Sequence, residues 1–75
     1  MKTKLTWKRP RRREIETAIL TVWATKESDL RVVRVVSLYH LPTRFVAMEG
    51  DRRILSEHRS RRAAEKACEK VWRHQ

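Results

Sequence analysis

The last fifteen residues place small apolar and charged side chains with the period of an α-helix. One face collects the apolar positions, namely Ala63, Ala64, Ala67, Cys68, Val71 and Trp72. Ser60 stands directly before this pattern, where its hydroxyl can accept a hydrogen bond from a backbone amide of the first turn. The sequence therefore predicts a helix from Ser60 to about His74, whose small residues allow it to lie close to a sheet.

Three segments before this helix have the pattern of β-strands. Residues 30–39 are dense in valine, and residues 44–49 and 52–57 are short runs separated by turn signals. Pro42 lies in the first connection, where it cannot donate to a strand ladder, and Gly50 with Asp51 supplies the second. These features predict an antiparallel meander.

Residues 14–24 fit two patterns equally well. Apolar side chains recur at helical spacing, which predicts an amphipathic helix. The same segment also alternates, and five of its eleven residues are β-branched, which favours a strand. Both interpretations stay open at the level of sequence.

These elements define an α+β fold in a chain long enough for one domain. We expect a three-stranded antiparallel sheet, or a four-stranded one if residues 14–24 form a strand, packed on one face by the C-terminal helix. Residues 1–13 contain seven basic side chains and no acidic one, and Pro10 interrupts any regular element. This segment is predicted to be a basic N-terminal arm before a single domain of residues 14–75.

The charge balance favours a polyanionic partner. The formal net charge is +10 on 75 residues, and arginine outnumbers lysine by 13 to 6. Such a charge attracts phosphate-rich molecules whose counterions it can displace. Guanidinium groups also bind phosphate bidentately and stack on bases.

The sequence contains no recognisable catalytic or metal-binding motif. Cys68 is the single cysteine, so neither an intramolecular disulfide nor a cysteine-rich metal site is expected. Ser56, Glu57 and His58 are adjacent, but neighbours on a strand point to opposite faces. We expect a non-enzymatic protein without metal or cofactor. Because no apolar run approaches a membrane span and no signal peptide is evident, a cytoplasmic location without membrane attachment is expected.

The order of elements and two short motifs resemble the double-stranded RNA-binding domain over roughly residues 14–73. That family carries a histidine shortly before a proline and a phenylalanine in the loop after its first strand, as His40, Pro42 and Phe45 do here. Its last helix opens with a serine, two basic residues and alanines, matched by Ser60, Arg61, Arg62, Ala64 and Ala67. The resemblance implies a first helix over residues 14–24 and binding of duplex RNA.

A second architecture follows if residues 14–24 are a strand. The chain then resembles the arm-type DNA-binding domains of integrases, in which a sheet packed by a helix reads duplex DNA. The two topologies have equal support from the sequence.

The candidate binding residues are basic side chains on four parts of the chain. Arg59, Arg61 and Arg62 surround the start of the last helix, where free amides and the helix dipole favour an anion, and Lys66 lies on the same helix. The resemblance implies that His40 reaches a phosphate or a 2′-hydroxyl. Arg44 belongs to a set of strand arginines able to form a phosphate platform, the others being Arg31, Arg34, Arg52 and Arg53. Arg11, Arg12 and Arg13 of the arm add sequence-independent affinity.

We therefore expect a nucleic-acid-binding protein that contacts phosphates and duplex shape, with RNA favoured over DNA. The alternative is a small regulatory protein, of the kind that phages and mobile elements encode, that binds and modulates an acidic host protein.

Overall fold

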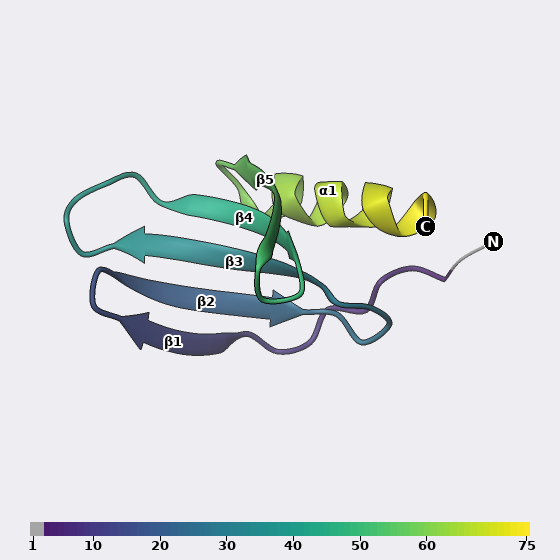
Figure 1. The fold of residues 1–75 in the computed structure, drawn as a ribbon, viewed down its shortest axis with the longest axis horizontal. Coiled ribbons are helices and arrows are strands. Elements are labelled where there is room, and N and C mark those ends of the chain that lie inside the picture. The colour runs from purple at the N-terminus through teal and green to yellow at the C-terminus, as the bar shows by residue number, and fades with distance from the viewer. Residues whose placement is uncertain (1–2) are drawn as a thin grey trace.

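The computed structural model describes residues 3–75 as a five-stranded antiparallel sheet and one C-terminal helix (Figure 1). The strands are β1 (Arg11–Ile15), β2 (Ala18–Ala24), β3 (Leu30–Ser37), β4 (Arg44–Glu49) and β5 (Arg53–His58), and the helix is α1 (Arg61–Arg73). The strands lie side by side in the order of the sequence. The predicted α+β class, with a helix packed on one face of an antiparallel sheet, is confirmed.

Helix α1 begins as its sequence predicts. The Ser60 hydroxyl accepts a hydrogen bond from the Ala63 amide at 3.2 Å, which satisfies one of the free amides of the first turn. Ala64 and Cys68 are fully buried, and they are small enough for the helix to approach the sheet closely. Lys70 and Arg73 lie in the last turn, where positive charge complements the helix dipole.

The helical interpretation of residues 14–24 is wrong. Residues 16 and 17 form a turn, so the first part of the segment belongs to β1 and the remainder forms β2. Strand β2 pairs with β1 on one side and with β3 on the other. Its β-branched residues thus lie in an interior strand that is paired along both edges. A helix over the same residues would forgo these cross-strand contacts. The sheet has five strands where three or four were expected, because the arginines before Glu14 are also part of β1.

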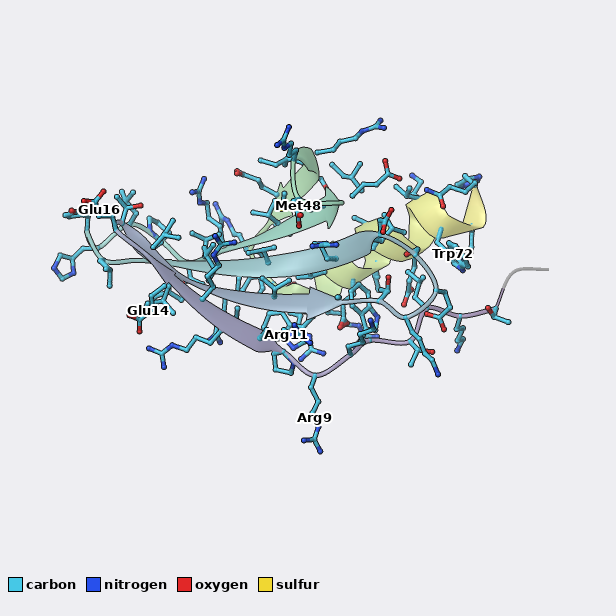
Figure 2. The ribbon with its side chains drawn as sticks, turned by 60° about the horizontal axis from the view of Figure 1, so that its bottom comes forward. Arg9, Arg11, Glu14, Glu16, Met48 and Trp72 are labelled. Atoms are coloured by element: carbon cyan, nitrogen blue, oxygen red, sulfur yellow. The ribbon has the colours of Figure 1, made fainter. Side chains whose placement is uncertain are left out.

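The predicted arm is attached to the folded body from Thr3 onward, and residues 1 and 2 lie outside the described residues. Leu5 is buried in the core, and the amide of Lys8 donates to the carbonyl oxygen of Ala24 at 2.8 Å. The Trp72 indole nitrogen donates to the Thr3 carbonyl oxygen at 2.6 Å, at the end of α1 (Figure 2). The segment is thus hydrogen-bonded at Thr3 and at Lys8, and Leu5 between them packs into the core, which explains why a basic segment contains apolar residues.

The two faces of the sheet differ in what covers them. Strand register places Val32 and Ala47 on one face, here called the helix face, where α1 packs against β3, β4 and β5. Val22, Val33 and Val46 lie on the opposite face, here called the open face. The β1 and β2 side of the helix face extends beyond α1 (Figure 1). Basic side chains are therefore distributed over two distinct surfaces.

Candidate nucleic-acid interface

A row of side chains crosses all five strands on the helix face, just before the start of α1. Register pairs Arg12 with Thr21, Thr21 with Arg34, Arg34 with Phe45 and Phe45 with His58. Directly opposite residues on antiparallel strands have neighbouring Cβ atoms, so these five side chains form a continuous line, here called the cross-sheet row. It carries two arginines and one histidine.

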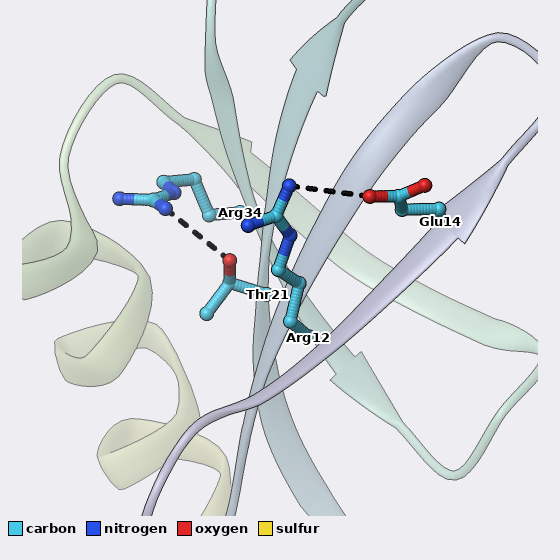
Figure 3. A network of polar contacts seen from close by, with 4 residues as sticks. All are labelled: Arg12, Glu14, Thr21 and Arg34. Atoms are coloured by element: carbon cyan, nitrogen blue, oxygen red, sulfur yellow. Dashed lines mark hydrogen bonds and ion pairs between the residues drawn. The ribbon is translucent and has the colours of Figure 1, made fainter.

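Arg34 is the central cation of this row. Its Nη2 donates to the Thr21 hydroxyl at 3.3 Å, as Figure 3 shows, and its guanidinium carbon lies 6.0 Å from the centroid of the Trp23 ring. Its Nε is buried without a hydrogen-bond partner, and no carboxylate within residues 3–75 forms an ion pair with it. A partly buried guanidinium without a counter-charge is costly, because desolvation is not offset by a neighbouring anion.

Arg61, in the first turn of α1, covers the same tryptophan. Its guanidinium carbon lies 4.5 Å from the centroid of the Trp23 ring, and its Nε donates to Glu65 at 3.0 Å. Trp23 is only 7% exposed. The attraction of each guanidinium to the indole ring stabilises the positions of Arg34 and Arg61. The start of the helix therefore holds two cations close to a single carboxylate, that of Glu65.

Arg12 extends the row to the edge strand. It pairs with Glu14 at 3.2 Å, and both side chains are about two-thirds exposed, at 66% and 69%. Ion pairs at such exposure contribute little to stability. Arg12 and Arg34 lie on either side of Thr21 (Figure 3), so an arriving phosphate could exchange for Glu14 at little cost.

His58 ends the row beside the helix cap. Its Nε2 lies 2.6 Å from the Ser56 hydroxyl, since residues two apart on a strand share a face. Glu57 points to the open face and pairs with Arg44, and within residues 3–75 no carboxylate hydrogen-bonds His58. The pair thus lacks the third group that orients a catalytic base, and it offers polar donors next to the row.

The structure separates the residues that sequence analysis grouped together. Arg59, Arg62 and Lys66 are exposed around the first turns of α1 and form no ion pair within the described chain. Arg12 lies in the cross-sheet row, and Arg61 lies next to it over Trp23. These five basic residues lie around the start of α1 and the adjoining helix face.

The other predicted residues lie elsewhere. Arg11 and Arg13 alternate with Arg12 and so point to the open face, together with Arg44, which pairs with Glu57 at 3.1 Å. His40 is exposed in the loop between β3 and β4, at the end of the sheet away from α1 (Figure 1), with a φ of 63°. The predicted interface is therefore divided between two faces and one loop.

Sequence reasoning did not single out Arg34 among the strand arginines, and it did not assign Trp23 or His58 to the interface. Arg34 was one of five strand arginines with no feature to distinguish it. The distinguishing feature is register, which sets Arg34 opposite Thr21 and Phe45 and close to α1. Register depends on pairings between distant segments, which a single sequence does not display.

Comparisons with known protein families, with curated proteins and with solved structures found no match to this chain. The two family resemblances therefore rest on sequence features alone. Within residues 3–75, no three side chains of the kinds that ligate metals lie together, and no helix is long and apolar enough to span a membrane.

Proposed function

We propose that this chain binds nucleic acid by holding backbone phosphates between the cross-sheet row and the first turn of α1. One observation carries the proposal: Arg34 and Arg61 lie over the same indole ring, and Arg34 has no carboxylate partner among the described residues. Two cations next to one buried ring raise the local positive potential, and a bound anion would offset this charge. Phosphate suits guanidinium groups because it accepts two parallel hydrogen bonds.

The start of the helix adds to this preference for an anion. The first turn of α1 contains no acidic residue, and its free amides carry a partial positive charge. Arg59, Arg62 and Lys66 are exposed nearby and would contact the flanking phosphates. The net charge of +10 would draw the polyanion toward the protein from a distance.

The proposed ligand is a duplex, contacted at its phosphates and without reading of base edges. The preference for RNA over DNA came from the resemblance that required a helix over residues 14–24, where the chain has strands. His40, which the same resemblance implied as a ligand of the backbone, lies in a loop away from α1. RNA over DNA is thus a sequence-based expectation that the following experiment decides.

The test is a binding titration of the full chain, freed of nucleic acid, against RNA and DNA duplexes of about 20 base pairs and their single strands at several salt concentrations. Contacts to about three or four phosphates predict a slope of about −3 in a plot of log K against log salt. Absence of binding at low salt, or an affinity independent of salt, would contradict the proposal. A higher affinity for the RNA duplex would support the expected preference.

A further inference from the structure

The open face of the sheet has an apolar centre that no other element of the described chain covers. Val33 and Val46 lie opposite each other in the middle of this face, and the side chains around them already bury them almost completely. The aliphatic surface that stays open belongs to their neighbours: Leu20, Val22 and Met48 are partly exposed, and Ile54 at the margin is 60% exposed. Helix α1 occupies the other face. Partly exposed aliphatic side chains on a sheet face without a second layer are available to a partner.

This face is hollowed into a continuous groove. Two hollows of about 240 and 330 Å³ both have Val22 and Arg31 among their lining residues, so they adjoin. Leu20, Val33 and Met48 line the larger hollow with aliphatic side chains. The groove can therefore accept apolar side chains from a segment that lies along it.

One wall of the groove is basic. Arg11 and Arg13 are the cross-strand partners of Val22 and Leu20, so each guanidinium stands beside an apolar floor position. Both arginines are exposed, and neither forms an ion pair within residues 3–75. Arg9, two residues before the start of β1, projects into solvent beyond the same wall (Figure 2). The wall thus offers positive charge that the protein itself leaves unneutralised.

We infer that this groove, with its floor at Val22 and Val33 and its wall at Arg11 and Arg13, docks an acidic amphipathic helix of a partner protein. The apolar stripe of such a helix would fill the hollows while its flanking carboxylates meet the arginines. Helix α1 already covers the other face of the same sheet, and a second helix would complete a three-layer arrangement.

Charge and chemistry disfavour other occupants. A second copy of the chain also carries a net charge of +10, so pairing two open faces would bring like charges together. A nucleic acid would find aliphatic side chains on the floor and no ring on which a base can stack. The inference does not depend on the proposed function, because the cross-sheet row lies on the other face.

The probe is a synthetic peptide of about 18 residues with leucine at helical spacing and glutamate elsewhere, long enough to form a stable helix on binding. It is titrated against the full chain by NMR, beside a peptide of identical composition in scrambled order. The designed peptide should shift the amide signals of Leu20, Val22 and Met48, and scrambling should weaken binding about tenfold, because the apolar stripe is lost. The variant Arg11→Glu/Arg13→Glu should also weaken binding about tenfold, whereas Arg12→Gln/Arg34→Gln should leave it unchanged.

Several results would overturn the inference. Equal binding of the two peptides would mean that charge alone is recognised, and shifts confined to the helix face would exclude the groove. A dimer that Arg11→Glu/Arg13→Glu strengthens would assign the open face to a second copy of the chain. If a nucleic-acid duplex shifts the same open-face amides, and the same variant abolishes duplex binding, the groove belongs to a nucleic-acid site instead.

Discussion

Arg34 of β3 and Arg61 of α1 place their guanidinium carbons 6.0 Å and 4.5 Å from the centroid of one indole ring, that of Trp23. The ring is nearly buried, so it fixes a sheet residue and a helix residue in one cationic cluster. Arg61 has a carboxylate partner in Glu65, whereas Arg34 has none among the described residues. This asymmetry makes Arg34 the most informative position for separating stability from binding.

Replacing Arg34 with methionine should maintain or raise stability while it weakens duplex binding. Methionine fills similar volume and removes a partly buried cation whose Nε has no partner, so the free energy of unfolding should stay equal or rise by about 1 kcal/mol. Duplex affinity should fall about tenfold with the loss of a phosphate contact. Denaturant unfolding and the binding titration measure the two effects on one preparation. Loss of stability with unchanged affinity would show that Arg34 is structural.

Cys68 should make the protein less stable at alkaline pH. Burial raises the pKa of the Cys68 thiol to about 11. The Sγ–H can donate to the Arg31 carbonyl oxygen at 3.5 Å, which also favours the protonated thiol. In the unfolded chain the thiol ionises near its ordinary value of 9.0, while the folded chain retains the proton. The stabilising contribution of the protonated thiol is therefore complete below pH 9 and is lost as pH rises toward 11. The loss of stability reaches about 2 kcal/mol at pH 10.5.

Comparison of the free energy of unfolding at pH 8 and pH 10.5, in the wild type and in Cys68→Ala, isolates this effect, because the two proteins differ only at the thiol. The alanine variant should be somewhat less stable at pH 8 and should lose less stability on going to pH 10.5. An equal loss in both proteins would contradict a buried, protonated thiol.

Protonation of Glu27 at acidic pH should weaken one attachment of the N-terminal segment, its contact with Thr6. Its two carboxylate oxygens accept from the Thr6 amide at 2.7 Å and from the Thr6 hydroxyl at 2.6 Å. The hydroxyl bond, followed by the amide bond, holds the pKa of Glu27 below its ordinary value of 4.5. A depressed pKa in the folded state means that the attachment contributes above pH 4.5 and is lost as pH falls below it.

NMR detection of the Thr6 amide from pH 6 to pH 3 checks this attachment. The signal should move toward its position in Glu27→Gln as the carboxylate becomes protonated. A Thr6 amide that does not respond to pH, or that is the same in both proteins at pH 6, would exclude the contact in solution.

The elements with unambiguous local signals were predictable from sequence. The last helix had a cap at Ser60 and a clear apolar face, and the strands around Gly50 had turn residues between short apolar runs. Residues 14–24 carried both periods at once, and pairing with β1 and β3 decided in favour of a strand. Long-range pairing overrides local preference in this way because β-propensity depends on cross-strand neighbours.

The candidate site was less predictable than the fold. Arg61 and Arg62 are adjacent in sequence, were predicted to act together and are both exposed. Consecutive helix positions nevertheless point about 100° apart, and Arg61 lies over Trp23. Arg11 and Arg12 were assigned to one arm, and as residues of strand β1 they point to opposite faces. Which basic residues share a surface depends on strand alternation and register, and the sequence left both open for the N-terminal third.

The most direct test of nucleic-acid binding by the cross-sheet row compares two variants that each remove two positive charges. Arg12→Gln/Arg34→Gln changes the row, whereas Arg52→Gln/Arg73→Gln changes the β4–β5 turn and the end of α1, outside the row. The row variant should lower duplex affinity by about tenfold or more and reduce the salt slope by about two, and the control should lower affinity by less than about threefold. Equal losses in the two variants would mean that only net charge matters and would contradict a site at the row.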